Sequence, residues 1–205
     1  MGKNIARNIT RITPEFTEFF EKKVRSMCKK KRYKHIRSTA RFSVKLSALF
    51  NENPSKAYFA GIAHDMARDL SEKTILKRAK EDGADIRYFE QESPVLLHGR
   101  AAAALLKQDF GITDYDILEA VRYHTYGNPG MGRLASILFI ADFLEPERKH
   151  ITDGYRKRLL KYDIDTIVRM VLENTFNYLN KKGAPIAPES WQLYKEKLKR
   201  DSKEG

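Results

Sequence analysis

The chain has 205 residues, a length that fits one domain or at most two small ones and allows a substantial core. Its formal net charge of +12 favours polyanionic partners such as nucleotides, polyphosphates or RNA. No run of about 18 apolar residues is present, which argues against a membrane span, and the basic N-terminus is not followed by an apolar secretion segment. Because the single cysteine, Cys28, cannot form an intrachain disulfide, we expect a cytoplasmic protein.

The apolar pattern predicts helices along almost the whole chain. We expect helices to begin at capping residues or prolines, namely Thr13-Pro14, Asn53-Pro54, Ser71, Ser93-Pro94 and a capping box formed by Thr113 and Asp116. We expect them to end at glycines, namely Gly83, Gly111, Gly127 and Gly183. Because no segment shows strand-like alternation, we predict an all-α bundle of roughly eight to ten helices.

Two connections between predicted helices stand out. The glycine-rich segment 125–132 directly follows His124. It is predicted to form a loop at the edge of the site that the His124 side chain faces. The segment 145–154 breaks the chain just after the helix that carries Asp142.

Helical spacing places six ligand-type residues on inward faces, and these are His35, His64, Asp65, His98, His124 and Asp142. The face of His35 also carries Thr39, Phe42, Leu46 and Leu49. A second face carries Ala57, Gly61, His64, Asp65 and Arg68, with small residues that allow a neighbouring helix to approach closely. Asp142 interrupts an apolar run, where an unpaired carboxylate would cost several kcal/mol.

Each of these residues alone has an ordinary structural explanation, such as a hydrogen-bonded core histidine or a salt-bridged aspartate. Together they would leave many polar groups unsatisfied, whereas two divalent ions would satisfy them all. Nitrogen and oxygen ligands without thiolate suit manganese, iron, zinc, cobalt or nickel. A water shared between two ions that an aspartate bridges could become a hydroxide that attacks phosphorus. Arg68 could neutralise the phosphoryl charge, or it could simply pair with Asp69.

The order of these residues resembles that of the HD-domain metal-dependent phosphohydrolases, His…His-Asp…His…His…Asp. The flanking segments are similar to the YqeK-type subfamily, the symmetrical bis(5'-nucleosyl)-tetraphosphatases. The similar segments are Ala63-His64-Asp65, Leu97-His98-Gly99, Tyr123-His124-Thr125 with Gly127, Pro129, Gly130 and Met131, Ala141-Asp142 with Glu145-Pro146 and Arg148, and 173–186. The resemblance covers about 32–190. It leaves an N-terminal helical extension, 1–31, and a basic C-terminal helix or tail, 188–205, in what we expect to be a single domain, 1–205.

The resemblance implies an HD fold in which a first metal takes His35, His64, Asp65 and Asp142, while a second takes Asp65, His98 and His124. It also implies hydrolysis of diadenosine tetraphosphate to two ADP, with iron as the favoured metal. The expected substrate contacts are Arg68, Thr125, Arg133 and Arg148. The chain departs from the subfamily at Ala135-Ser136 and Ala187, which puts substrate detail in doubt rather than metal binding.

Alternative functions stay open at this point. One is an HD nucleotidase or phosphodiesterase acting on another nucleotide. Another is a non-catalytic nucleotide-binding or RNA-binding module, suggested by the net charge and by the cluster 29–32. Nucleic acid is not the expected partner, because a binding protein has little physical need for six inward ligand-type residues. The basic C-terminal run of Lys195, Lys197, Lys199 and Arg200 is interpreted as a solvated surface, and a homodimer is compatible with the sequence.

Overall fold

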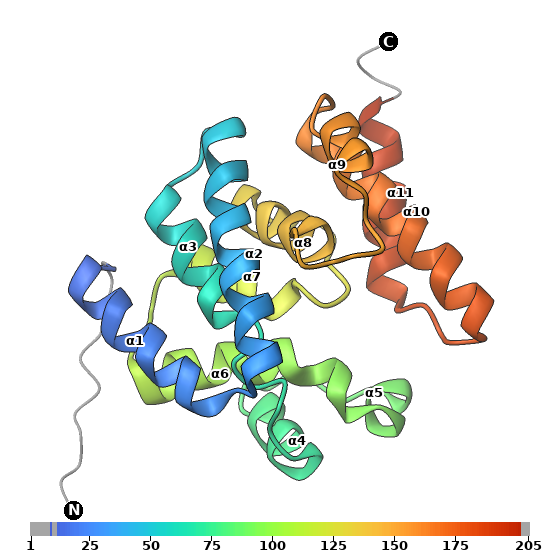
Figure 1. The fold of residues 1–205 in the computed structure, drawn as a ribbon. Helices are drawn as coiled ribbons and strands as arrows, with labels where there is room; N and C mark the ends of the chain where they lie inside the picture. Colours follow the sequence, from blue (N-terminus) through green and yellow to red (C-terminus); the bar gives the residue numbers. More distant parts are fainter. Residues whose placement is uncertain (1–8, 10–11, 202–205) are drawn as a thin grey trace, which may run out of the picture.

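The computed structural model describes residue 9 and residues 12–201, and these form a bundle of helices (Figure 1). The α-helices are α1 (Pro14–Met27), α2 (Lys30–Leu49), α3 (Pro54–Ala63), α4 (Glu72–Lys80), α5 (Tyr88–Glu92), α6 (His98–Phe110), α7 (Tyr115–Tyr123), α8 (Arg133–Leu144), α9 (Asp153–Leu159), α10 (Ile164–Lys182) and α11 (Pro188–Asp201), and a 3-10 helix, η1 (Pro94–Leu97), precedes α6. The all-α prediction is confirmed. The described residues contain eleven α-helices rather than eight to ten, because short helices such as α5, with five residues, escape a periodicity argument.

Capping hydrogen bonds confirm three of the five predicted helix starts, and Gly111 and Gly183 are C-caps as predicted. In contrast, α4 ends at Lys80 and α7 at Tyr123, before the predicted Gly83 and Gly127. The side chains of Thr13, Asn53 and Ser71 each accept from backbone N–H groups in the first turn of the helix that follows. The capping box predicted at 113–116 is wrong, because Asp114 is the N-cap and accepts from the backbone N–H of Ile117. The segment after Ser93 forms the 3-10 helix η1, without a side-chain cap.

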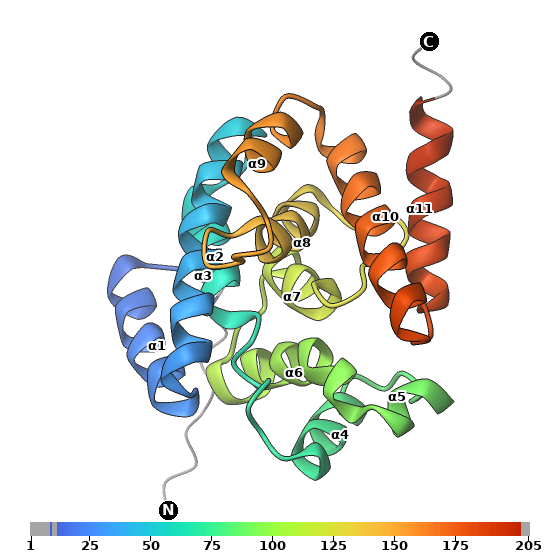
Figure 2. The same ribbon diagram turned by 45° about the vertical axis from the view of Figure 1, so that its right-hand side comes forward.

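Helices α2 and α3 pack against each other, and both pack against α8 (Figures 1 and 2). Gly61 on α3 makes this close approach feasible, since a Cβ atom built there would lie 2.5 Å from the Cα of Ala40 on α2. The prediction that small residues on this face allow a neighbouring helix to approach is therefore confirmed. The contact brings the first half of α2, which carries His35, alongside the end of α3, which leads into His64.

Gly61→Ala is expected to destabilise the protein by about 1–3 kcal/mol, because the added methyl group meets backbone atoms that cannot rotate away. The thermal unfolding midpoint should fall accordingly, by about 2–4 °C for each kcal/mol in a chain of this size. Gly154→Ala is the matched control, since a Cβ atom there meets nothing within 4 Å. An unchanged midpoint in Gly61→Ala would show that α2 and α3 can separate without cost.

Both ends of the described chain extend the core. On α1, Phe20 is fully buried, and its ring centroid lies 4.6 Å from that of Phe59 and 4.9 Å from that of Phe110. At the other end, α10 and α11 lie side by side, and α10 packs against α8 (Figure 2).

The interpretation of the C-terminal run as a solvated surface is wrong for Lys197, which is buried and lies 2.6 Å from a carboxylate oxygen of Asp165. Lys195 and Lys199 are exposed, and the side chain of Arg200 lies outside the described residues.

None of the described helices combines the length and the apolar character that a membrane crossing requires.

Candidate metal centre

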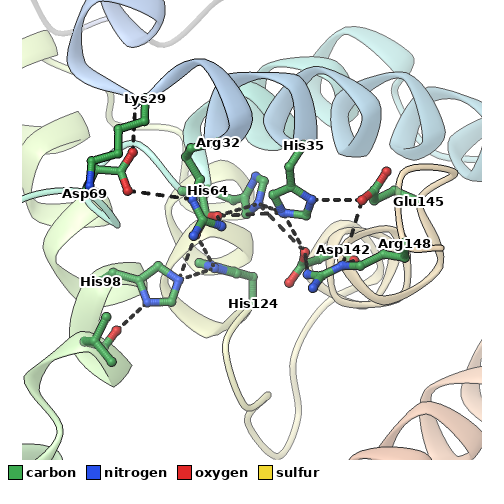
Figure 3. Close-up of polar contacts among 12 residues, drawn as sticks. Lys29, Arg32, His35, His64, Asp69, His98, His124, Asp142, Glu145 and Arg148 are labelled. Carbon is green, nitrogen blue, oxygen red and sulfur yellow. Dashed lines mark hydrogen bonds and ion pairs between the residues drawn. The ribbon is translucent and has the colours of Figure 1, made fainter. Parts of the chain in front are cut away.

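Five segments of the bundle bring the six predicted ligands to one place, and Figure 3 labels all of them except Asp65. His35 projects from α2, His98 is the first residue of α6, and Asp142 belongs to the last turn of α8. His64 and His124 are the C-cap residues of α3 and α7, and Asp65 follows in the turn after α3. The structure thus brings together all six residues that helical phase singled out.

Four of these residues form a first group around the Nε2 atoms of His35 and His64, which lie 3.3 Å apart. Oδ1 of Asp142 lies 3.0 Å from Nε2 of His35 and 4.0 Å from Nε2 of His64. Oδ2 of Asp65 lies 3.7 Å from both of these nitrogens. The first group therefore gathers two imidazole nitrogens and two carboxylate oxygens.

The remaining two histidines form a second group with the other oxygen of Asp65. Oδ1 of Asp65 lies 3.0 Å from Nε2 of His98 and 3.8 Å from Nε2 of His124. The two Nε2 atoms lie 2.9 Å apart. Asp65 consequently directs one oxygen toward each group, which is the arrangement of a carboxylate that bridges two ions.

Hydrogen bonds at the far side of each ring orient the four imidazoles. Nδ1 of His64, His98 and His124 lies 2.6–2.8 Å from the backbone oxygen of the residue three positions earlier. The carbonyls of Gly61 and Val121 lie in the last turns of α3 and α7, where backbone oxygens lack an intrahelical partner, while that of Val95 also accepts from the backbone N–H of His98. A proton on Nδ1 leaves the Nε2 lone pair directed at the centre, as in histidines that bind metal.

The close approach of the nitrogen atoms tests whether the residues fit a metal. Two Nε2 lone pairs at 2.9 Å, as in His98 and His124, repel each other unless a cation or a proton lies between them. The same holds for His35 and His64 at 3.3 Å. Imidazole and carboxylate donors without thiolate suit manganese, iron, cobalt, nickel or zinc, so the donor set fits the predicted ions.

The protonation states also suit metal binding. Burial lowers the pKa of His64 to about 3 and lowers that of His98, so that both rings are neutral near pH 7. Burial opposes charge on His35 as well, but the carboxylates of Asp142 and Glu145 outweigh it and raise its pKa to about 9. His35 therefore has to lose a proton when a metal binds.

The two carboxyl groups are held in their ionised form. Burial opposes the charge of Asp65, but the neighbouring His64 and the hydrogen bonds to His124 and His98 keep its pKa well below the usual value. For Asp142, burial is likewise outweighed by the hydrogen bond to His35 and by the charge of Arg148. The centre thus offers negative oxygens to a cation.

Two further residues contact the ligands, and sequence reasoning gave neither of them a role. A guanidinium nitrogen of Arg32, Nη1, lies 2.5 Å from Oδ2 of Asp65. The buried carboxylate of Glu145 accepts a hydrogen bond from Nδ1 of His35, with Oε1 at 3.0 Å. Both could have been found by helical phase, because each lies three residues from a predicted ligand, Arg32 before His35 and Glu145 after Asp142.

The predicted substrate contacts are only partly brought to the centre. Arg148 is there, with Nη2 2.6 Å from Oδ1 of Asp142. Arg68 is half-buried and lies within the electrostatic reach of Asp65. Arg133 does not join them, since it begins α8, about 13 Å of helix rise from Asp142, and donates to the backbone oxygen of Asn51 at 3.3 Å.

Two of the helical faces drawn from the sequence need correction. The face that was expected to run from Ala57 to Arg68 ends early, because α3 stops at Ala63 and residues 64–69 form turns. On α2, Leu49 is 52% exposed and does not share the buried face of His35. Neither correction moves a predicted ligand away from the centre.

Two cavities open beside the ligands. The first, called here the basic cavity, has a volume of about 710 Å³, and its lining includes six lysines and arginines, among them Arg32 and Arg148, against the three acids Asp69, Glu145 and Glu147, together with His35. The second, called the mixed cavity, has a volume of about 860 Å³, and its lining includes His124, Thr125, Asp142, Phe139, Phe143 and Tyr178. Arg148 and the exposed His150 line both cavities.

The three departures from the subfamily pattern lie in packed regions. Ala135 and Ser136 are buried in α8, where the Ser136 hydroxyl donates to the backbone oxygen of Gly132 at 3.0 Å. Ala187 is buried just before α11. None of the three lines either cavity, so they do not alter the residues beside the centre.

Glu145→Gln is expected to weaken metal binding or activity by about 10–100-fold, because the amide no longer holds the Nδ1–H of His35 through a charged acceptor. Metal titration and a hydrolysis assay on the same preparation would measure the change. Glu72→Gln, an exposed residue in the first turn of α4, is the control and should leave both quantities unchanged. Equal behaviour of the two variants would show that Glu145 does not orient His35.

Comparisons with known proteins agree on one family. The HD domain family matches residues 32–147. The chain is 34% identical over 169 residues to a protein of Halalkalibacterium halodurans named bis(5'-nucleosyl)-tetraphosphatase, symmetrical, covering 82% of this chain and 89% of that protein. It is 31% identical over 166 residues to a protein of the same name from Bacillus subtilis, with 80% and 87% covered.

A solved structure supports the same assignment. It is described as a predicted HD superfamily hydrolase involved in NAD metabolism from Clostridium acetobutylicum, and it superposes with a TM-score of 0.82 at 29% sequence identity. The match covers 89% of this chain and 97% of that one.

Proposed function

Since this chain belongs to the HD-domain family, we propose that it is a metal-dependent hydrolase that cleaves diadenosine tetraphosphate symmetrically into two molecules of ADP. The resemblance to the YqeK-type subfamily is confirmed by two relatives that are named for this activity. The sequence match covers most of the length of each. The reaction is the hydrolysis of a phosphoric anhydride at the middle of a symmetrical substrate.

The shared carboxylate of Asp65 is the main support for a centre with two ions. His35, His64 and Asp142 would hold the first ion with Oδ2 of Asp65, while His98 and His124 would hold the second with Oδ1. When bound, two such ions polarise phosphate oxygens and make a nucleophilic water available near neutral pH. Iron is favoured by the resemblance, and the donor atoms also suit manganese, cobalt, nickel and zinc.

The two cavities give the remaining residues their roles. The mixed cavity, with the rings of Phe139, Phe143 and Tyr178, would take one adenosine, because a nucleoside needs apolar walls and a few polar groups. The basic cavity would take phosphates. Because ligand residues line both cavities, a substrate that reaches from one to the other lays its middle across the centre.

Three arginines would position the tetraphosphate and offset its charge. Arg32 and Arg148, which line the basic cavity, already point toward Asp65 and Asp142 and could release these carboxylates to the ions and turn to phosphate. Arg68 adds a third charge near Asp65. Such charges accelerate phosphoryl transfer when they are placed where negative charge develops.

Product analysis tests the proposal. Metal-loaded protein should convert diadenosine tetraphosphate to ADP alone, and elemental analysis should give two metal equivalents for each chain. Formation of AMP and ATP would show asymmetric cleavage. Hydrolysis of mononucleotides with no action on diadenosine tetraphosphate would instead identify a nucleotidase of the same fold.

A further inference from the structure

A third cavity, called here the basic groove, runs along the outer face of α2 and has no role in the proposed reaction. It has a volume of about 1360 Å³, and seven of its 13 lining residues are lysine or arginine, against the single acid Glu147. Five of the cations follow one stripe of α2 at helical spacing, and these are Lys30, Lys34, Arg37, Arg41 and Lys45. The stripe extends over about 22 Å of helix rise.

Most of this charge is available to a ligand. Acids pair with two members of the stripe, Glu147 with Lys34 at 2.6 Å and Glu21 with Arg37 at 3.3 Å. Three other cations of the stripe, and Lys31 beside it, carry no ion pair with any described residue. The three are Lys30, Arg41 and Lys45. Arg25 and Arg37 rest against the ring of Tyr33, at 5.9 and 6.0 Å from its centroid, which limits their motion.

The basic groove is continuous with the catalytic region. It shares Lys31, Lys34 and Glu147 with the basic cavity, whose lining includes His35 of the first ligand group. A polyanion in the groove can therefore reach the centre with one end. Arg41 and Lys45 lie about 9 and 15 Å of helix rise beyond His35 and extend the path further.

We propose that the basic groove binds the RNA chain of a second class of substrate, RNA whose 5′ end carries a nucleoside tetraphosphate. This inference rests on the proposed function, because such an end has the same four phosphates between two nucleosides as diadenosine tetraphosphate. The nucleoside occupies the mixed cavity, the tetraphosphate crosses the centre, and the following nucleotides lie along the stripe on α2.

The reaction is the same hydrolysis. Water adds its oxygen to one of the two central phosphorus atoms, and the anhydride bond between that phosphorus and the bridging oxygen breaks. The bridging oxygen leaves with the other half, so the products are a nucleoside diphosphate and an RNA with a 5′ diphosphate. The released protons go to solvent, and no oxidant or reductant is required.

The concave shape and the position of the groove favour single-stranded RNA over other polyanions. A membrane surface is flat and cannot follow a groove to the centre, whereas a flexible strand presents one phosphate for each nucleotide to a row of cations. The six inward ligand-type residues favour an enzyme over a mere binding protein, but they do not exclude RNA as a substrate of that enzyme. The structure places the charge on one face that leads to the ligands.

A paired charge reversal tests this proposal. Wild type, Arg41→Glu/Lys45→Glu and the control Lys195→Glu/Lys199→Glu are assayed with diadenosine tetraphosphate and with an oligoribonucleotide that carries a 5′ adenosine tetraphosphate. The control changes the exposed face of α11 by the same charge. Fluorescence anisotropy with a 5′-diphosphate RNA measures binding without hydrolysis, at low and at raised salt.

For the oligoribonucleotide with the 5′ adenosine tetraphosphate, called here the capped RNA, the kcat/KM of the groove variant should be lower by about tenfold or more. Its RNA affinity should depend less on salt, since two phosphate contacts are removed. Its activity on diadenosine tetraphosphate should match that of the control variant. Equal cleavage of capped RNA by both variants would overturn the proposal, as would a wild type that cleaves only diadenosine tetraphosphate. Failure of the wild type on both substrates would instead overturn the proposed function.

Discussion

Asp65→Asn is expected to remove both metal ions and to lower the rate of diadenosine tetraphosphate hydrolysis by about a thousandfold. The amide keeps the size of the side chain but cannot offer a negative oxygen to each of the two ligand groups that Asp65 faces. A loss of about 4 kcal/mol in transition-state stabilisation corresponds to this factor. Elemental analysis and the rate of ADP formation measure the two effects on one preparation.

The neighbouring Asp69→Asn variant is the matched control. Asp69 lies in the same turn region and accepts a hydrogen bond from the backbone N–H of Lys29 at 2.9 Å, but it belongs to neither ligand group. It should keep two metal equivalents, whatever its effect on substrate affinity. Such an effect can arise because Asp69 lines the basic cavity and its Oδ1 lies 4.0 Å from Nε of Arg32. Circular dichroism and thermal unfolding show whether Asp65→Asn still folds; a folded variant with two ions would contradict the bridging role of Asp65.

Helical phase located the ligands because three of them lie within helices and the other three lie at a helix end or one residue beyond it. Asp142 shares the buried side of α8 with Leu138 and Ala141, both of which are buried, so an apolar run with one acid was sufficient to predict its direction. The same reasoning could have reached Glu145. Glu145 is the C-cap of α8 and lies three residues after Asp142, so it follows the same side of the helix.

The prediction that Arg68 lies on the same helical face as His64 was wrong for a different reason. The segment after α3 contains no glycine or proline until residue 83, so nothing in its composition signals that the helix stops at Ala63. The helix ends there in the structure, and the backbone N–H groups of Met66 and Arg68 donate to the residues three positions earlier, as in 3-10 turns. Tertiary packing decides such an ending, which a single sequence does not reveal.

The charge of the chain shows a similar limit. Composition predicts an affinity for polyanions but does not say where they bind. The location depends on which face of α2 turns to solvent, and that is set by the packing of α2 against α3 and α8. Helical spacing alone places the five cations of the stripe on one face of α2. Only the structure shows that this face lines a groove and that the groove shares residues with the basic cavity.

The two ligand groups should be separable by mutation, because they share only Asp65. His98→Gln removes a nitrogen that lies 3.0 Å from Oδ1 of Asp65, while the residues of the first group stay in place. We therefore expect one metal equivalent to remain and hydrolysis to slow by about a hundredfold, or about 3 kcal/mol in activation free energy.

His150→Gln is the control for His98→Gln, since the same substitution is made at an exposed histidine that belongs to neither ligand group. It should retain two metal equivalents, whatever its effect on substrate affinity. Two equivalents in His98→Gln would show that His98 is not a ligand. Loss of both ions would show that the first group cannot hold a metal alone, and the centre would then be a single cooperative unit rather than two sites joined by Asp65.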